Sequence, residues 1–291
     1  MFQQAIEIAG NYTRPIFTIL RRYGHKEIIP GSATIFFVNE DAWAVTTKAV
    51  AKIFLDASNI DKKYAEFSEK RKTVSQEEVE SLASSYGYGK DSVAQLKVNF
   101  VGCVDVIKSV QCKLHPTLDL ALIHFEGYER TGYSRPCVFA GSGSDAKPGK
   151  MLCRLGFPFP EFKNYFYDEE KDDIRWNKEG RANTPRFPLS GMITRLVGGP
   201  GGIVGIELEN PGVKGQEGGP VFDERGVVYG VYSGASALGF GMCIHVDRIK
   251  EFLRKENVSY RTDKAETEKE VKEEESLLLA DMEDTLDTKL N

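Results

Sequence analysis

The sequence predicts an all-β fold of two antiparallel β-barrels with about six strands each, a helical insertion and C-terminal helices. Aromatic and β-branched residues recur in short alternating runs, which is typical of strands. The 28 glycines favour tight turns between them. With 291 residues, 41% of them hydrophobic, the chain can bury one large core or two modest ones. About six runs fall in each half, so we expect two barrels that meet near residues 127–137.

The first half begins as a β-meander. Three alternating runs, IFTILRR, SATIFFV and WAVTTKAV, occupy residues 16–55 and are separated by Gly31 and by the turn at residues 39–41. We therefore expect an N-terminal barrel over residues 1–128.

A helical insertion interrupts this barrel over about residues 57–92. This stretch is polar, with Tyr64 and Phe67 at helical spacing. Ser75 and Glu78 have the spacing of a capping box and would open a helix through QEEVESLASS.

Strand patterns return after the insertion with VAQLKVNFVGCVDVI and LDLALIHF, and continue with MLCRLGF, SGMITRLV, GIVGIEL, GPVFDE, VVYGVYS and GFGMCIHV. A short helix, DRIKEFLRKE, follows them. Asp247 is expected to cap it, and Ile249, Phe252 and Leu253 would pack back on the barrel. Residues 129–256 are thus predicted to form a C-terminal barrel and its closing helix.

The last segment, residues 257–291, is an acidic tail. Residues 263–287 hold eleven acids and three bases. Apolar residues recur at three- and four-residue spacing in its final part, which predicts an amphipathic helix. These residues are Leu279, Met282, Leu286 and Leu290. Such a helix would either dock on the protein's own body or serve for partner binding or self-association through residues 277–290.

Charge and composition exclude several classes of function. The tail carries eleven acids minus three bases, or −8, so the rest of the chain carries +3 of the net −5. A clustered basic surface for nucleic acid is not expected. No signal segment and no apolar run of about 18 residues is present, so we expect no membrane association and a cytoplasmic location. The odd number of cysteines and their spacing favour buried free thiols over disulfides, metal or cofactor. They are Cys103, Cys112, Cys137, Cys153 and Cys243.

Four ordered segments resemble motifs of chymotrypsin-like serine proteases of the HtrA (DegP) type. They are GSATIFFVNEDAWAVTTKAVA at 31–51, HPTLDLALIHFEG at 115–127, NPGVKGQEGGPVFDERGVVYGVYSGAS at 210–236, and GFGMCIHVDRIKEFL at 239–253. The resemblance implies the double β-barrel of that family. It does not cover the insertion, the charged loop at 163–186 or the tail.

Two of the three catalytic positions implied by this resemblance hold residues that cannot do the chemistry. The histidine position falls on Ala49, the aspartate position on Asp119, and the serine position on Glu217, where the motif reads GQEGGP. In the working triad, serine attacks the scissile carbonyl, histidine takes its proton, and aspartate orients the histidine. Without the hydroxyl and the imidazole, no activated nucleophile remains.

The resemblance also implies which parts of the binding apparatus are retained. The turn Gly215, Gln216, Glu217, Gly218 keeps its glycines, so the N–H groups of Gly215 and Glu217 would point into the oxyanion position. The Glu217 side chain either folds into that position or turns outward toward Lys48 or a ligand. For Asp119 we expect a structural role, accepting from backbone amides or from the Ser233 hydroxyl.

Substrate pairing in this family implies a peptide-binding strand at Tyr232, Ser233 and Gly234, which would allow β-augmentation without catalysis. The base of the specificity pocket falls near Pro211. Because no acid stands there, the pocket is expected to prefer small or apolar groups. The loop around Trp176 is expected to be a mobile surface segment.

These observations favour a catalytically inactive serine protease homologue that binds peptides or proteins as an adaptor or regulator. One alternative is a working endopeptidase or other hydrolase whose nucleophile is unrecognised, such as a cysteine near the oxyanion turn. Another is a structural subunit held by the C-terminal helix.

Overall fold

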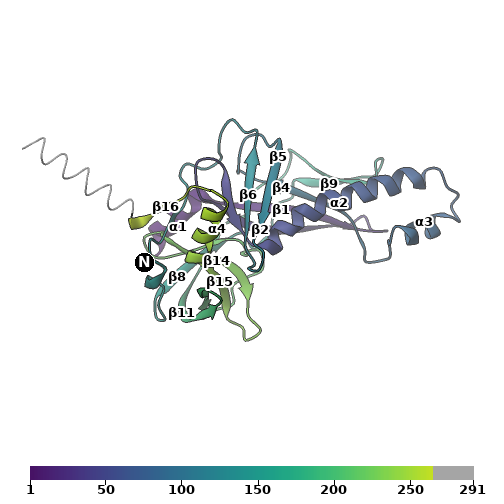
Figure 1. The fold of residues 1–291 in the computed structure, drawn as a ribbon. Coiled ribbons are helices and arrows are strands. Elements are labelled where there is room, and N and C mark those ends of the chain that lie inside the picture. The colour runs from purple at the N-terminus through teal and green to yellow at the C-terminus, as the bar shows by residue number, and fades with distance from the viewer. Residues whose placement is uncertain (265–291) are drawn as a thin grey trace, which may run out of the picture.

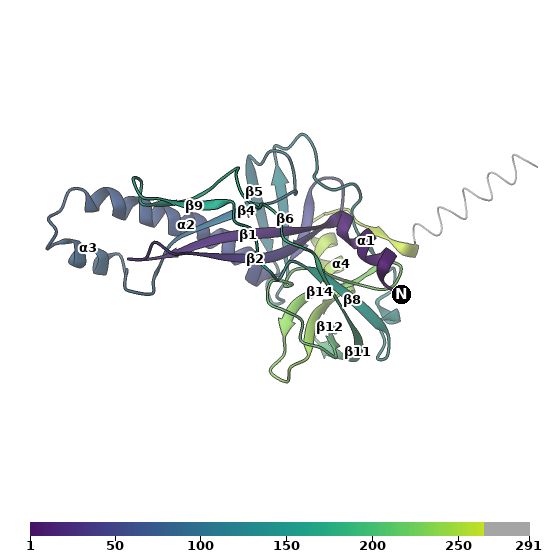
Figure 2. The same ribbon diagram turned by 180° about the vertical axis from the view of Figure 1, so that it is seen from behind.

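Two antiparallel β units form the body of the molecule, and a long helical arm projects from the first of them (Figure 1). The computed structural model describes residues 1–264. The predicted tail helix at 277–290 therefore lies outside the described residues. Seen from behind, the first unit lies between the arm and the second unit (Figure 2).

The first unit is a six-stranded antiparallel sheet with the order β4-β1-β2-β3-β6-β5. No pairing joins β4 to β5 in the described part of the chain, so this sheet is an open half-barrel. Its strands are β1 (Thr13–Arg22), β2 (Ile28–Phe37), β3 (Trp43–Thr46), β4 (Val93–Phe100), β5 (Ser109–Leu114) and β6 (Ala121–Glu126).

The second unit closes into a barrel. Its strands run in the order β13-β8-β11-β12-β15-β14, and β14 pairs again with β13. They are β8 (Met151–Gly156), β11 (Phe187–Gly199), β12 (Gly202–Leu208), β13 (Pro220–Phe222), β14 (Val228–Ala235) and β15 (Gly241–His245). Two short strands, β7 (Val138–Phe139) and β16 (Arg261–Thr262), add parallel pairings beside β14.

The predicted fold class, an all-β protein built on two six-stranded units, is confirmed. The exact limits predicted for the segments 1–128, 129–256 and 257–291 stay predictions. An N-terminal helix that sequence patterns missed, α1 (Gln3–Tyr12), is held by burial of its small and aromatic residues and by a bond from the Tyr12 hydroxyl to the Gly226 carbonyl.

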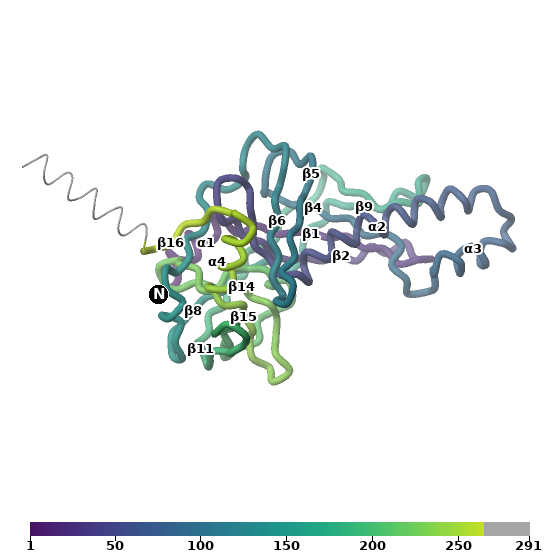
Figure 3. Tube along the Cα trace, in the orientation of Figure 1, coloured from purple at the N-terminus to yellow at the C-terminus, as the bar shows by residue number. Residues whose placement is uncertain are grey.

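The arm consists of α2 (Lys48–Arg71) and α3 (Val79–Ser85), lying beside a hairpin of β9 (Tyr165–Asp168) and β10 (Asp173–Trp176) (Figure 3). The prediction of strand through residues 48–55 is wrong, because the Thr47 hydroxyl caps a helix there by accepting from the Val50 amide. Alternating β-branched residues do not determine strand where such a cap is present.

The predicted capping box is present only in part. Both the amide and the hydroxyl of Ser75 donate to the Glu78 carboxylate, and α3 itself begins at Val79. Tyr64 and Phe67 are buried against the arm's own aromatic residues, as their helical spacing indicates.

Two further expectations need correction. The 163–186 segment, expected to be a mobile surface loop, contains the β9–β10 hairpin, which packs on the first sheet because Ile174 is fully buried and Trp176 contacts Phe162. Helix α4 (Val246–Lys255) is capped by His245, whose ring accepts from the Asp247 amide, and not by Asp247. In the part of the chain described, no helix is long and apolar enough to cross a membrane.

Candidate functional site

Asp119 lies next to Ala49 at the beginning of α2. Its Oδ1 accepts from the Ala49 amide at 2.9 Å. Thr47 satisfies the Val50 amide one residue on. The first N–H groups of a helix have no partner within the helix, and a carboxylate there is also favoured by the helix dipole. Asp119 therefore acts as part of the cap of α2, which agrees with the first of its two expected structural roles.

Glu217 turns its side chain back onto its own loop. The Gly215 amide donates to the Glu217 carboxylate. Gly215 has φ of +96°, and a Cβ there would come within 2.8 Å of Pro158, so both conformation and space require glycine. The N–H group that the resemblance assigns to oxyanion binding thus already has an anionic acceptor from within the chain.

Both β units hold this turn in place. The Thr34 hydroxyl, on β2, donates to the Gly215 carbonyl at 2.9 Å. The Gln216 side chain donates to the Phe187 carbonyl and accepts from the Val213 amide, at 2.9 and 3.0 Å. Gln216 is fully buried. The turn is therefore held by hydrogen bonds to Thr34 in the first unit, to Phe187 in the second unit, and to Val213 in its own loop.

Lys48 and the histidines do not complete a catalytic group. The Lys48 ammonium donates to the Pro116 carbonyl at 3.3 Å rather than to Glu217. Among residues 1–264, no hydrogen bond or ion pair joins a histidine to Asp119 or Glu217. His25 lies in the turn after β1, His115 accepts from its own loop, His124 stacks on Trp43, and His245 caps α4.

The predicted peptide-binding strand lies at the end of β14. One edge of this segment pairs with β15, with a register shift between Tyr232 and Gly234. On the other edge the pairing with β13 ends at Val231, and the Tyr232 amide and carbonyl are bonded to Gly219 and Gly218. Tyr232 is therefore not available to a peptide, and no described strand pairs with that edge from Ser233 on. The Ser233 hydroxyl donates to the Met242 carbonyl at 3.0 Å and does not reach Asp119.

The segment expected to form the base of the specificity pocket contacts a residue that the sequence did not single out. The Tyr232 hydroxyl donates to the Pro211 carbonyl, and the Arg154 guanidinium lies over the Tyr232 ring at 4.8 Å. Arg154 stands in β8, and its neighbours in that strand are apolar. In the sequence, a charged residue within a run of apolar strand residues is the one feature that marks Arg154 as unusual.

An apolar hollow of about 580 Å³ opens beside Ala49, between α2 and the first sheet. Its wall includes Ile16, Leu20, Val50, Ile53, Leu96 and Pro158. Lys52 and Lys214 also line it.

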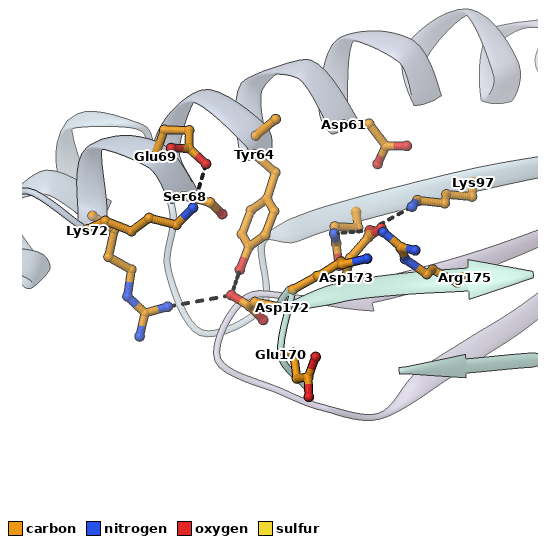
Figure 4. Close-up of a pocket in the computed structure, with 14 residues that line it drawn as sticks. Asp61, Tyr64, Ser68, Glu69, Lys72, Lys97, Glu170, Asp172, Asp173 and Arg175 are labelled. Atoms are coloured by element: carbon orange, nitrogen blue, oxygen red, sulfur yellow. Dashed lines mark hydrogen bonds and ion pairs between the residues drawn. The ribbon is translucent and has the colours of Figure 1, made fainter. Parts of the chain in front are cut away.

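A larger hollow of about 740 Å³ lies in the arm, away from these residues (Figure 4). Two of its carboxylates have partners within it: Asp173 accepts from Lys97 at 2.6 Å, and Asp172 accepts from the Tyr64 hydroxyl at 2.5 Å. The Lys97 contact joins β4, and the Tyr64 contact joins α2, to the β9–β10 hairpin, so we regard this hollow as part of the arm's structure. Among the described residues, no three His, Cys, Asp or Glu side chains are grouped so as to hold a metal ion.

Comparison with known proteins supports the fold. No family model and no curated protein matches the sequence significantly. Among solved structures, the HtrA-type protease AlgW, determined with a decapeptide, is similar with a TM-score of 0.50 and 12% identity over 87% of this chain and 66% of that one. The Rv3671c protease from M. tuberculosis, in its active form, has a TM-score of 0.46 and 14% identity, over 87% and 85% of the two chains. This chain thus spans about two thirds of AlgW and has the double-barrel fold of HtrA-type, trypsin-like serine proteases.

Proposed function

We propose that this protein is a pseudoprotease, an inactive serine protease homologue that binds extended peptides or protein segments as an adaptor or regulator. The observation that carries the proposal is the bond from the Gly215 amide to the Glu217 carboxylate. At the position where the family has its nucleophile, this chain has an acceptor that occupies the oxyanion donor. Ala49 supplies no base, and Asp119 accepts from the amide of that same residue.

The state of the thiols supports this proposal over a hydrolase with a cysteine nucleophile. All five cysteines are unpaired, and four of them are buried. Burial raises the pKa of Cys153 to about 11 and that of Cys243 to about 12. Burial likewise raises the pKa of Cys112 to about 11. A thiol attacks as its thiolate, so these groups are poor nucleophiles at neutral pH.

The unpaired edge of β14 supports peptide capture. Ser233 and Gly234 are half-buried and Ala235 is exposed, so a strand could add its main-chain hydrogen bonds there. AlgW, which shares the fold, was solved with a decapeptide. The hollow beside Ala49 would give one side chain of such a peptide an apolar place.

Fluorescence anisotropy with a library of labelled octapeptides tests the proposal. We expect saturable binding by the wild-type protein, and binding about tenfold tighter by Glu217→Ala, because a ligand carbonyl then gains the Gly215 amide. A charge-assisted hydrogen bond contributes about 1.5–3 kcal/mol, and tenfold in affinity is about 1.4 kcal/mol. Glu224→Ala, which changes an exposed glutamate in the turn after β13, is the matched control and should bind like wild type.

Absence of saturable binding across the library contradicts peptide capture. If Glu217→Ala binds the peptides as tightly as wild type, peptide capture stands, and only the proposal that Glu217 blocks the Gly215 amide is contradicted. The hydrolase alternative is tested separately with casein, a fluorophosphonate probe and iodoacetamide. Turnover of casein together with selective labelling of one residue would overturn the assignment as inactive.

A further inference from the structure

Arg154 is a buried cation with unsatisfied donors. It is fully buried and is among the largest side chains enclosed in the structure. Its Nη2 donates to the Asn210 carbonyl at 2.9 Å. Its Nε and Nη1 are buried and have no hydrogen-bond partner among the described residues. Buried polar groups are nearly always paired, so such a group requires an explanation.

No carboxylate neutralises this guanidinium in the part of the chain that the structure describes. The two other buried cations each have one: Arg21 lies 3.0 Å from Asp172, and Lys250 lies 3.1 Å from Asp247. The contacts of Arg154 are the Tyr232 ring at 4.8 Å and the Asn210 carbonyl. Burial lowers the pKa of Arg154, yet an arginine side chain stays protonated in proteins. The charge is thus buried and uncompensated.

Two glycines make room for this side chain. A Cβ at Gly241 would lie 2.5 Å from Arg154 Nη1, and one at Gly212 would lie 3.1 Å from the same nitrogen. Gly212 has φ of +76° and follows Pro211, whose carbonyl accepts from the Tyr232 hydroxyl. The guanidinium therefore lies directly against the segment that the resemblance assigns to the base of the specificity pocket.

We propose that Arg154 is a specificity-determining residue that binds a carboxylate of the captured peptide, either an acidic side chain or the C-terminal group. This inference rests on the proposed peptide-binding function. Guanidinium groups bind carboxylates through strong charge-assisted hydrogen bonds, and Nε and Nη1 supply the donors. A preference for carboxylates replaces the preference for small or apolar groups that the sequence suggested. The earlier expectation rested only on the lack of an acidic residue at Pro211.

The segment over Arg154 must move for a ligand to reach it. Pro211 and Lys214 are exposed, whereas the guanidinium beneath is not. Two contacts tie this segment down, the Tyr232 hydroxyl bond to Pro211 and the Arg154 bond to Asn210.

The test uses N-acetylated octapeptide libraries in three arms, measured by anisotropy at constant ionic strength. The first arm fixes Glu at one position with an amidated end, the second fixes Gln there, and the third is neutral and ends in a free carboxylate. We expect the Glu arm or the free-carboxylate arm to bind at least tenfold tighter than the Gln arm, and whichever does so identifies the source of the carboxylate. Equal binding in all three arms overturns the inference and leaves peptide capture standing. Absence of binding in all arms overturns both.

Arg154→Met separates a binding role from a structural one, because methionine keeps the length and removes the charge. We expect this variant to lose the preference for acidic peptides and to unfold at a higher urea concentration, since a buried uncompensated cation is gone. A lower unfolding midpoint with an unchanged preference would show that Arg154 is structural. Arg21→Met, in which the Asp172 carboxylate loses its buried arginine partner, is the matched control and should unfold at lower urea. If Arg154→Met does not fold, the three arms on the wild-type protein decide.

Discussion

The two β units differ in how their sheets end, and the difference separates a closed barrel from an open sheet covered by other elements. The second unit closes on itself through the pairing of β14 with β13, and it carries the Glu217 turn and the free edge of β14. The first unit stays open, and α2 and the β9–β10 hairpin pack against it. Ala49 lies in the first turn of that helix. The position that the resemblance assigns to the histidine thus lies against the open unit.

In the open unit one buried arginine, Arg21, joins the sheet to the arm, and its removal should have the largest effect on stability. Arg21 donates to Gln95 at 2.7 Å, pairs with Asp172 at 3.0 Å, and lies over the rings of Tyr64 and Tyr167. Arg21→Ala leaves Asp172 and Gln95 without this partner. We expect a loss of about 3 kcal/mol in the free energy of unfolding, measured by urea denaturation.

Arg22→Ala is the matched control for this experiment. Its ion pair with Asp91 joins side chains that are 45% and 78% exposed. Exposed pairs contribute little, so the change should stay below about 1 kcal/mol. Equal losses for the two variants would contradict the view that Arg21 joins the arm to the first sheet.

The contact between the two units should have the next largest effect. The Thr34 hydroxyl donates to the Gly215 carbonyl and accepts from the Phe157 amide, at 2.9 and 3.2 Å, and the residue is fully buried. Thr34→Val keeps the shape and leaves both partners unsatisfied. We expect a loss of about 2 kcal/mol in the free energy of unfolding and weaker peptide binding, since the turn that carries Glu217 loses an anchor.

Thr117→Val is the control, because Thr117 is exposed. A change within about 0.5 kcal/mol is expected there. If Thr34→Val unfolds at the same urea concentration as wild type, the turn that carries Glu217 does not depend on the first unit.

The sequence revealed more about the closed unit than about the open one. Strand periodicity and ordered motifs predicted both β units, and the glycines of GQEGGP predicted a tight turn at Glu217. The start of α2 was mistaken for strand because alternating Ala and Val residues fit either structure, and the decisive Thr47 cap is a single hydroxyl. This cap is itself a local signal, and it outweighs alternation of apolar residues as a guide to the start of a helix.

The candidate site shows the same limit. The motifs identified Ala49, Asp119 and Glu217 as the residues at the three positions. They did not show where the carboxylates of Asp119 and Glu217 point. The Glu217 carboxylate accepts from an amide only two residues away, but the turn that allows this is held by Thr34 and Phe187, which are distant in the sequence. The position of Arg154 beneath Pro211 likewise depends on its contact with a distant segment at Asn210. The sequence shows that Arg154 is a charged residue within an apolar strand, but it does not show which residues lie next to it in the fold.

The smallest predicted effect concerns pH and the end of the second unit. Burial lowers the pKa of His245 from its ordinary value of 6.5, with the charges of Lys250 and Arg248 acting in the same direction and that of Asp247 opposing them. The folded protein therefore binds this proton less readily than the unfolded chain. Stability should be fully present above pH 6.5 and should fall as the pH drops through 6.5 toward the folded value.

His245→Asn isolates this contribution, because asparagine is also a good helix cap and cannot titrate. We expect its stability to change less than that of wild type between pH 7 and 5, measured by urea unfolding at intervals of pH. His115, whose pKa burial also lowers, accounts for slope that remains in the variant. Identical slopes in the two proteins would mean that the ring can protonate within the folded state. In the structure, a nitrogen of the His245 ring caps α4 by accepting from the Asp247 amide. Identical slopes would therefore contradict the view that this acceptor is needed for the cap.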